Sequence, residues 1–414
     1  MNGGAVLYLL GRLMWSLALI LLVPAGFSYA RGGPDFAAFV VSGLLVGGVG
    51  VVLDRRFRQP TGFAFGRTEA FYLVTLAWLT ASVIGGLPWV FYRGPGFAVD
   101  ALFEGTAGFT TTGASILTDI EGQPSALILW RSMTQWLGGM GIIVLGIAIL
   151  PKLSTGGVAL LSAEAPGPIM EKLTPRIART AKALWGIYFL LTCLEVLALV
   201  LAKMTPLDAI NHAFATVSTG GFSTRNAGIA AYASPSIEMI LTLFMFLSGV
   251  NFALYFHLLR GKASVLAKDS EFRLYLTIAL VATLAISFQL WRNGQELADA
   301  LRLAVFQVVS IQTTTGFATA DFDAWPAFST SILFVLFFSG ACAGSTSGSM
   351  KVVRVQILLK KVVADMRRIG KPHLVIPIRQ GAAVIPPSVV DGVTSFVVLF
   401  VLLFLLGGLS LTAM

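Results

Sequence analysis

Three short Thr/Ser-Gly segments recur inside a chain that is otherwise strongly apolar. They are Thr110-Thr111-Thr112-Gly113, Ser218-Thr219-Gly220-Gly221 and Thr313-Thr314-Thr315-Gly316. Each segment follows a half-length apolar stretch and precedes a full-length one. In hydrocarbon, non-helical backbone survives only where protein buries it or where it lines a hydrated cavity. Three such segments in one chain therefore predict that they line one shared hydrated pathway.

The composition indicates a polytopic membrane protein, because 56% of the residues are hydrophobic and only 12% are charged. Runs long enough to cross about 30 Å of hydrocarbon lie at 6–30, 36–53, 69–92, 125–150, 183–202, 236–259, 274–291, 327–350 and 392–411. We predict an all-α membrane protein with about nine transmembrane helices and three pore half-helices. Because residues 27–30 resemble a cleavage site, a cleaved secretory signal is the alternative to a retained first helix.

Lysine and arginine concentrate in one set of loops, which the positive-inside rule places in the cytoplasm. This set holds Arg55, Arg56, Arg58, Arg67, Lys152, Lys172, Arg176, Arg179, Arg260, Lys262, Lys268, Arg273 and a cluster over 351–379. The opposite loops carry the Thr/Ser-Gly segments and several acids. We therefore expect these segments to face the periplasm. The net charge of +9 follows from this sidedness and from anionic lipid, so it does not indicate nucleic acid.

The three segments belong to one internal repeat. Residues 101–115, 209–223 and 304–318 share their first alanine and their terminal Thr/Ser-Gly element. A polar stretch follows each one and ends at Pro124, Pro235 or Pro326, where a proline suits the first turn of a new helix. The predicted unit is a helix, a half-helix, a filter and a second helix.

This unit suits a cation, because the C-terminal end of a half-helix carries partial negative charge. The loop after it can turn carbonyl oxygens inward to replace an ion's hydration shell, and glycine permits the required positive φ. The candidate filter residues are Thr111, Thr112, Gly113, Thr219, Gly220, Gly221, Thr314, Thr315 and Gly316. A single Thr-Gly after a helix is usually only a C-cap. Three Thr-Gly or Ser-Gly elements at equivalent positions of one repeat favour the pore over a set of separate C-caps.

Isolated polar residues carry less information. Glu104 and His212 lie in the first two half-helices, where they either tune cation entry or bond to neighbouring backbone. Glu195 and Asn251 lie in long apolar runs and are functional candidates, although an interhelical hydrogen bond is the favoured interpretation for Glu195. Cys193 and Cys342 are far apart, so no disulfide is predicted. No catalytic set is visible, and we predict no enzyme activity.

The segments resemble the Trk/Ktr/HKT superfamily of potassium uptake proteins, most closely its bacterial TrkH-type members, along the whole chain. The matching motifs are Thr-Thr-Gly-Ala, Ser-Thr-Gly-Gly-Phe-Ser-Thr, Thr-Thr-Thr-Gly-Phe and the run from Gly340 to Lys351. The resemblance implies potassium uptake across the inner membrane through a pseudo-fourfold pore. Potassium as the transported ion is then contacted by Thr112, Gly113, Thr219, Gly220, Thr315 and Gly316. No covalent cofactor is implied.

The resemblance also implies a homodimer and a cytoplasmic nucleotide-binding regulatory subunit of the TrkA type, through which alone a nucleotide would act. The basic loops near 152–182 and 351–379 are then candidate docking surfaces. The alternative is that these loops only obey the charge bias of the inner face. Channel-like flow and ion-coupled symport both remain open.

The run over 340–349 interrupts an apolar stretch with glycine and serine, which weaken a helix. It resembles the family's broken helix, whose middle forms an intramembrane gating loop. The candidate loop residues are Gly340, Gly344, Ser345, Thr346, Ser347 and Gly348. A packing face of small residues is the alternative. A nucleotide P-loop is excluded, because the spacing before Lys351 is wrong and an intramembrane helix precedes it.

These features predict five regions. They are two extra N-terminal helices at 1–60, pore repeats at 61–165, 166–265 and 266–385 with a broken second helix in the third, and the first helix of an incomplete fourth repeat at 386–414. A C-terminally truncated sequence is the favoured explanation for the missing fourth filter. The alternatives to potassium uptake are an ion-coupled secondary transporter and a non-conducting regulatory subunit.

Overall fold

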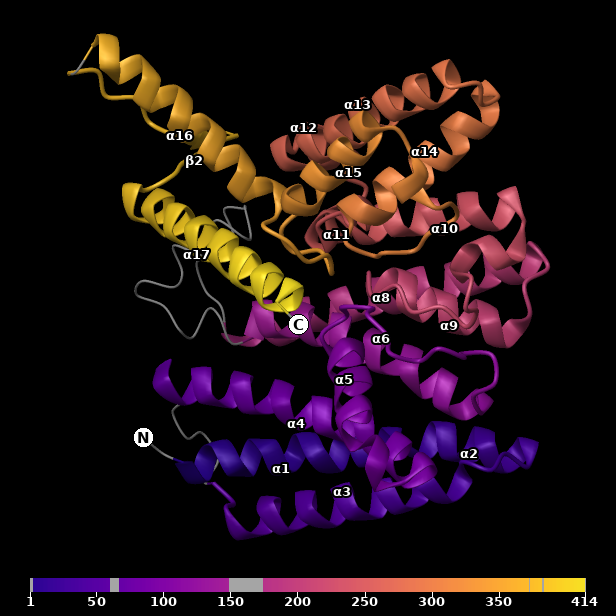
Figure 1. Ribbon diagram of the computed structural model, residues 1–414. Helices are drawn as coiled ribbons and strands as arrows, with labels where there is room; N and C mark the ends of the chain where they lie inside the picture. Colours follow the sequence, from indigo (N-terminus) through magenta and orange to yellow (C-terminus); the bar gives the residue numbers. More distant parts are fainter. Residues whose placement is uncertain (1–2, 60–66, 149–173, 372, 382, 414) are drawn as a thin grey trace. The chain divides into compact units, whose positions relative to one another are not determined.

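The computed structural model describes the chain except residues 1–2, 60–66, 149–173, 372, 382 and 414 (Figure 1). The chain forms two compact units, and each contains residues from several parts of the sequence. Unit 1 comprises 1–142, 188–245 and 315–320, and unit 2 comprises 143–187, 246–314 and 321–414. Because the division falls inside three helices, the units do not coincide with the predicted repeats.

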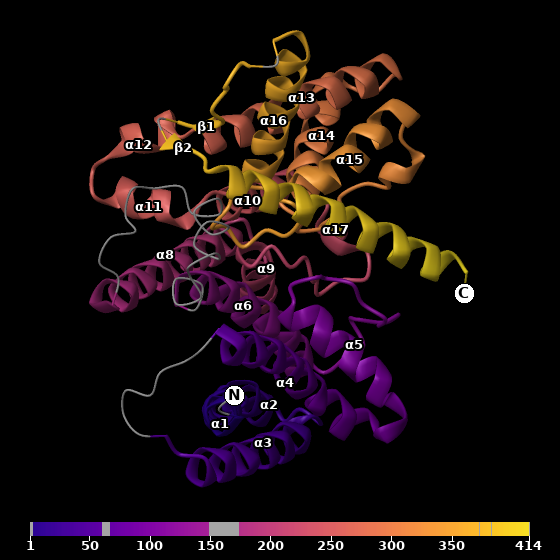
Figure 2. The ribbon, with the colours of Figure 1, turned by 90° about the vertical axis from the view of Figure 1, so that its left-hand side faces the viewer.

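Unit 1 begins with four long apolar helices. They are α1 (Gly3–Ile20), α2 (Leu22–Arg31), α3 (Phe36–Arg56) and α4 (Arg67–Arg93). The short helix η1 (Pro95–Phe97) leads into α5 (Ala98–Phe109), and α6 (Ser125–Ala148) follows a polar loop. The rest of unit 1 holds the end of α8 (Thr174–Leu201), α9 (Pro206–Val217), η3 (Gly228–Tyr232) and most of α10 (Pro235–Ser248). Helix α1 packs between α3 and α4 (Figure 2).

Unit 2 carries the C-terminal elements. Its helices are α11 (Phe252–Leu259), α12 (Ala263–Lys268), α13 (Ser270–Arg292), α14 (Leu297–Gln312), η4 (Phe322–Ala324), α15 (Ala327–Ser339), α16 (Val352–Gly370) and α17 (Pro387–Thr412). A two-stranded antiparallel hairpin, β1 (Arg379–Gln380) and β2 (Ala383–Val384), lies between the last two helices. Apolar residues of α13, α14 and α15 form one core cluster of this unit.

Six helical spans among the described residues are long and apolar enough to cross a membrane. They are Gly3–Arg31, Phe36–Arg56, Thr68–Arg93, Ala181–Leu201, Ser270–Arg292 and Pro387–Thr412. Six of the predicted runs therefore form long apolar helices. Helix α6 begins directly after Pro124, α10 at Pro235 and α15 directly after Pro326, so the predicted helix starts are confirmed. The total of about nine crossings stays a prediction, because the run 125–150 leaves the described residues after 148.

The predicted run 236–259 is not one continuous helix. It divides into α10 and α11, which are bent by 95°. Asn251 is the N-cap of α11, and its Oδ1 accepts the N–H of Ala253 at 2.9 Å. Asparagine bonds to nearby backbone and therefore favours such a cap over a helix interior. A single polar side chain thus starts a new helix in the middle of an apolar run.

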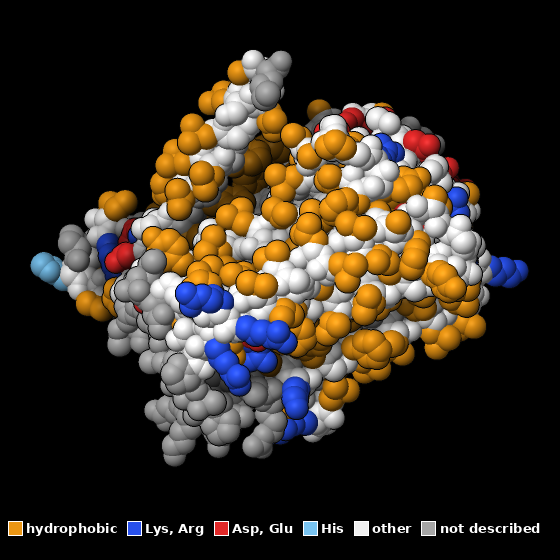
Figure 3. All heavy atoms as spheres, turned by 90° about the horizontal axis from the view of Figure 1, so that it is seen from below, with side chains coloured by type: hydrophobic (Ala, Val, Ile, Leu, Met, Phe, Trp, Pro, Cys, Tyr) orange, Lys and Arg blue, Asp and Glu red, His pale blue; other side chains and the backbone are white. Residues whose placement is uncertain are grey.

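The core of unit 1 surrounds Trp130 of α6, which is fully buried. Its ring meets Phe39 and Phe109 edge to face, and its Nε1 donates to the carbonyl oxygen of Gly85 at 2.9 Å. Many large apolar side chains lie on the outside instead, among them Leu44, Val52 and Phe71. Figure 3 shows such side chains spread over one face, with Lys and Arg gathered toward one end. A surface of this kind suits lipid rather than water.

Asp35, between α2 and α3, joins the N-terminal helices to α6. Its side chain is buried, its Oδ1 accepts the hydroxyl of Ser28, and its Oδ2 accepts the N–H of Leu127 at 3.1 Å. Leu127 lies in the first turn of α6, where backbone N–H groups lack a partner within the helix. Asp35 therefore caps α6 from a distant part of the sequence.

Asp35→Ala should lower the free energy of unfolding by about 1–3 kcal/mol, because it leaves buried donors without an acceptor. Asp35→Asn keeps one acceptor oxygen and should lose less. Thermal unfolding of the purified protein in detergent measures both variants. Equal stability of Asp35→Ala and the wild type would show that this cap contributes nothing.

Candidate functional site

The three Thr/Ser-Gly segments share one backbone conformation. They follow α5, α9 and α14 directly, and each contains two residues with positive φ, separated by one residue. The values are 53°, 53° and 60° at Thr111, Thr219 and Thr314, and 75°, 78° and 84° at Gly113, Gly221 and Gly316. Positive φ is uncommon outside glycine. Its recurrence at the same threonine position shows that the conformation belongs to the repeat.

The first two segments also end their helices with the same hydrogen bonds. Thr112 and Gly220 donate to the carbonyl oxygens of Ala107 and Ala215, at 2.9 and 2.8 Å. Gly113 and Gly221 donate to the same two oxygens at 3.4 and 3.3 Å. Each of these two segments is therefore a helix C-cap, which is the alternative interpretation of a Thr-Gly element after a helix. What distinguishes the segments from ordinary caps is their position relative to one another.

Within unit 1 the ends of the three segments lie side by side in sequence order. A Cβ atom on Gly113 would overlap the carbonyl oxygen of Gly220, and one on Gly221 would overlap that of Thr315. A Cβ atom on Gly316 would have no described atom within 4 Å. The first segment thus meets the second and the second meets the third, while the far side of the third is open. The structure brings together Gly113, Gly220, Gly221 and Thr315.

Gln135 of α6 braces the second segment. Its Nε2 donates to the carbonyl oxygen of Gly220 at 2.7 Å, and its Oε1 accepts the N–H of Phe222 at 3.1 Å. The side chain is fully buried. Both bonds flank Gly221 and hold its positive-φ turn. Our sequence analysis missed Gln135, although a glutamine inside an apolar run was a usable signal.

Arg131 of α6 forms a buried ion pair with Glu104 of α5. Its Nε lies 3.0 Å from Glu104 Oε2, and both side chains are at most 3% exposed. The guanidinium also donates to the carbonyl oxygen of Ser223 at 3.0 Å and lies 3.5 Å from the centroid of the Phe222 ring. Arg131 therefore ties the first half-helix to the backbone after the second segment. Sequence analysis missed it as well.

Glu104 and His212 both bond to residues that follow the Thr/Ser-Gly segments. Glu104 Oε1 accepts the hydroxyl of Ser115 and the N–H of Ile116, at 2.6 and 2.8 Å. His212 contacts the carbonyl oxygen of Asp208 through Nδ1 at 2.8 Å and Ser223 Oγ through Nε2 at 3.1 Å. Each side chain thus makes a hydrogen bond to backbone, as one interpretation predicts, and also binds at least one side chain, while a role in tuning cation entry stays a prediction.

Asp208 anchors a further polar cluster at the start of α9. It accepts the hydroxyl of Thr224 at 2.7 Å and pairs with Arg225 at 3.0 Å. Burial raises the pKa of the Asp208 carboxyl, but the hydrogen bonds from Thr224, Thr205 and Arg225 and the charge of Arg225 reverse this, so that its pKa lies below its ordinary value. Asp208 is therefore ionised at neutral pH.

Glu195 of α8 lies beside the hydroxyl of Thr216 in α9, and the interhelical hydrogen bond that we expected stays a prediction. The carboxylate is fully buried, and neither oxygen has a hydrogen-bond partner among the described residues. The hydroxyl of Thr216 donates instead to the carbonyl oxygen of His212 in its own helix. Because a hydroxyl oxygen that donates its hydrogen can still accept one, Thr216 can bind a protonated Glu195.

Residues 340–351 form an irregular loop between α15 and α16, as predicted. Gly340 and Gly344 have positive φ. Cys342 donates its N–H to the carbonyl oxygen of Gly249 at 3.0 Å, and the carbonyl oxygen of Gly344 accepts the N–H of Phe252 at 3.1 Å. The loop thus packs on the break between α10 and α11. A continuous helix with a small-residue packing face is excluded here.

The loop's hydroxyl groups lie inside the protein. Ser345, Thr346 and Ser347 are at most 3% exposed. Thr346 donates to the carbonyl oxygen of Ser248, and Gly348 donates its N–H to Thr314 Oγ1 at 2.7 Å. Through Thr314 the loop therefore contacts the third Thr/Ser-Gly segment.

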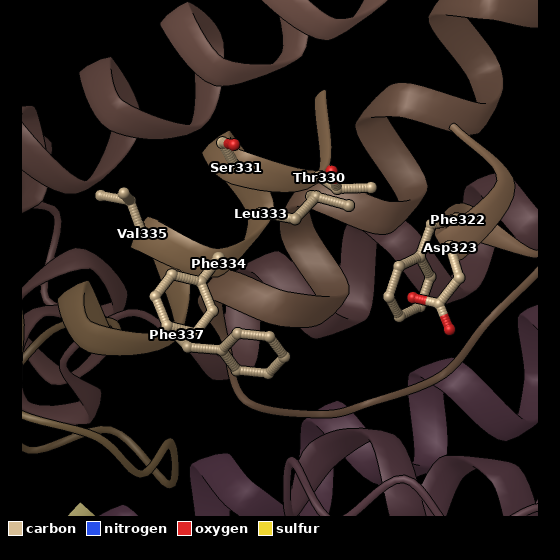
Figure 4. Close-up of a pocket in the computed structure, with 8 residues that line it drawn as sticks. All are labelled: Phe322, Asp323, Thr330, Ser331, Leu333, Phe334, Val335 and Phe337. Atoms are coloured by element: carbon tan, nitrogen blue, oxygen red, sulfur yellow. The ribbon is translucent and has the colours of Figure 1, made fainter. Parts of the chain in front are cut away.

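A separate hollow of about 440 Å³ lies beside α15 in unit 2. Figure 4 shows its lining, which comes from α15 and η4 and in which Asp323 is the charged residue. Phe334, Val335 and Phe337 are strongly exposed. None of the predicted site residues lines this hollow. We therefore interpret it as an irregularity of an apolar outer face.

Comparison with known proteins identifies the family of this chain. The family model TrkH, described as a cation transport protein, matches residues 52–414. The Trk system potassium uptake protein TrkH of Salmonella typhimurium is 41% identical over 350 residues, which cover 83% of this chain and 72% of that protein. TrkH of Halomonas elongata is 39% identical over 409 residues, 97% of this chain and 84% of that protein.

A solved structure is also similar. The crystal structure of the potassium transporter TrkH from Vibrio parahaemolyticus aligns with a TM-score of 0.91 at 34% identity and covers 100% of this chain and 86% of its own. The resemblance that the sequence motifs indicated is thereby confirmed. The chain belongs to the TrkH family of cation transport proteins.

Proposed function

We propose that this multi-pass membrane protein takes up potassium through a pore lined by its Thr/Ser-Gly segments. The observation that carries the proposal is the contact, within unit 1, of Gly113 with Gly220 and of Gly221 with Thr315. The relatives are named potassium uptake proteins, which supports potassium as the ion.

The helix ends supply the attraction for a cation. Helices α5, α9 and α14 each end at a Thr/Ser-Gly segment, where the helix dipole places partial negative charge. Carbonyl oxygens of Thr112, Gly113, Thr219, Gly220, Thr315 and Gly316 replace water around the ion. The oxygen of Gly220 already accepts from Gln135, so one lone pair is left for the ion. Entry is driven by the membrane potential, at about 2.3 kcal/mol per charge per 100 mV.

The loop 340–351 is the proposed gate. Its hydrogen bond to Thr314 connects it with the third segment. Its backbone is irregular, and irregular backbone at membrane depth can line a permeation path. The loop residues Gly340, Gly344, Ser345, Thr346, Ser347 and Gly348 then decide whether the path below the filter is open.

Regulation is proposed to follow the pattern of the family. A homodimer would bind a cytoplasmic nucleotide-binding subunit on the basic surface over 351–379, with the Thr/Ser-Gly segments toward the periplasm. Most of the other candidate surface, 152–182, lies outside the described residues. In the first surface Lys360 donates to the carbonyl oxygen of Arg379, and Arg368 pairs with Asp365. These bonds order a cationic face that suits an acidic partner.

Growth of a potassium-uptake-deficient bacterium at low external potassium tests the proposed function. We expect rescue by this chain, and potassium uptake that depends on membrane potential. Normal insertion of the chain into the membrane without rescue would indicate a non-conducting subunit. Saturable uptake of an organic solute without potassium uptake would instead support a secondary transporter and overturn the proposal.

A further inference from the structure

Glu271 lies at the start of α13, and its carboxylate is directed at the loop rather than at its own helix. The side chain is buried. Its Oε1 accepts two backbone N–H groups, from Ala343 at 2.6 Å and from Val353 at 3.2 Å. Ala343 lies near the beginning of the loop and Val353 in the first turn of α16. One oxygen atom therefore holds both ends of the loop.

A backbone hydrogen bond joins the same two ends, from Val352 N–H to the carbonyl oxygen of Ala341 at 3.0 Å. We call residues 341–343 and 352–353 the neck of the loop. Glu271 closes the neck from the side. Beyond the neck, the ammonium of Lys351 donates to the carbonyl oxygens of Ser345 and Ser347 and holds the middle of the loop.

We propose that Glu271 is a latch that keeps the loop 340–351 in the conformation seen here. That the latch controls transport rests on the proposed function. That it holds the loop rests on the contacts alone. A carboxyl oxygen accepts a backbone N–H in either protonation state, and a buried N–H left without an acceptor costs about 1–3 kcal/mol. If the neck opened, the two N–H groups and the buried carboxyl oxygen would each lose a hydrogen-bond partner, so neck and latch stabilise each other.

Asp269, two residues earlier, shows that Glu271 is not needed to cap α13. Asp269 is the N-cap of this helix, and its Oδ1 accepts the N–H of Phe272 at 2.7 Å. The two acids share one helix end but bind different backbone, one in the helix and the other in the loop. Asp269→Ala is therefore a matched control that removes a carboxylate without touching the neck.

Cys342 reports directly on the neck, because it lies within it and is fully buried. The experiment uses the full chain in native membranes with Cys193→Ser, since Cys193 is exposed. The measurement is the rate at which a maleimide modifies Cys342. Glu271→Ala should raise this rate about tenfold or more. Glu271→Gln, which keeps an acceptor oxygen, should raise it less, and Asp269→Ala should leave it near wild type.

General unfolding must be separated from release of the latch. A second reporter, Ala209→Cys in a background without Cys193 and Cys342, probes a fully buried position in α9 of unit 1. Its rate should not change in Glu271→Ala. Equal Cys342 rates in Glu271→Ala and Asp269→Ala, or an equal rise at both reporters, would overturn the latch. Faster Cys342 labelling without any change in potassium flux would support the latch and contradict the gating role of the loop.

Discussion

Replacing Gly113 or Gly221 by alanine is expected to reduce the preference for potassium over sodium by about tenfold to a hundredfold, whereas Gly316→Ala should have a smaller effect. All three residues have positive φ, and such backbone strain costs about 1–3 kcal/mol in a residue with a side chain. Each 1.4 kcal/mol corresponds to about a factor of ten.

The difference among the three glycines comes from their surroundings. A Cβ atom at Gly113 or Gly221 would meet a backbone oxygen of the next segment, which cannot move away as a flexible side chain would. These oxygens belong to Gly220 and Thr315, which are proposed to contact the ion. A Cβ atom at Gly316 would meet no described atom within 4 Å. Gly316→Ala therefore introduces strain without displacing a neighbouring segment.

Ion flux in proteoliposomes under bi-ionic conditions measures this preference. Gly26→Ala is a suitable control, because this glycine lies in α2 with no neighbouring atom within 4 Å. If Gly113→Ala, Gly221→Ala and Gly316→Ala all kept wild-type selectivity, the assignment of the filter would be wrong.

Removal of one partner of the Glu104–Arg131 pair should have the largest effect on stability. Arg131→Met leaves a buried carboxylate without its cation, which costs about 3–5 kcal/mol. The same change removes the bond to Ser223 and the contact with Phe222. Because a folded protein is stable by only about 5–15 kcal/mol, we expect little folded protein in the membrane and little potassium uptake.

The Arg225–Asp208 pair is the matched control. It has the same N–O distance of 3.0 Å, but the Arg225 side chain is 38% exposed. Arg225→Met should therefore cost no more than about 1 kcal/mol. The double variant Glu104→Gln with Arg131→Met removes both charges and should recover part of the loss. Denaturant unfolding in detergent measures the free energy of unfolding of the wild type and of the three variants. A smaller loss of this free energy for Arg131→Met than for Arg225→Met would contradict the buried-pair argument.

Helix ends were predictable from the sequence because they depend on nearby residues. Proline at 124, 235 and 326 begins a helix, and the Thr/Ser-Gly segments end one, whatever the rest of the chain does. The loop over 340–351 was predictable for the same reason, since glycine and serine weaken a helix locally. Asn251 is the exception: its capping role is local, yet one polar residue in an apolar run did not reveal the break.

The side chains that hold the site were not predictable, because their partners are distant in sequence. Arg131 binds a residue 27 positions away, Glu271 one 72 positions away and Gln135 one 85 positions away. No spacing rule connects such residues. Each was visible only as a polar side chain within or beside an apolar run.

The amino-acid sequence by itself determined that this protein lies in a membrane, where many of its helices begin and end, and which glycines turn the backbone. These properties follow from hydrophobicity and from torsional preferences, which act over a few residues. Only the tertiary structure decided that Gly113, Gly220, Gly221 and Thr315 lie together and that one carboxylate, Glu271, holds both ends of a loop. Contacts of this kind depend on how whole helices pack, and a linear pattern does not specify that packing.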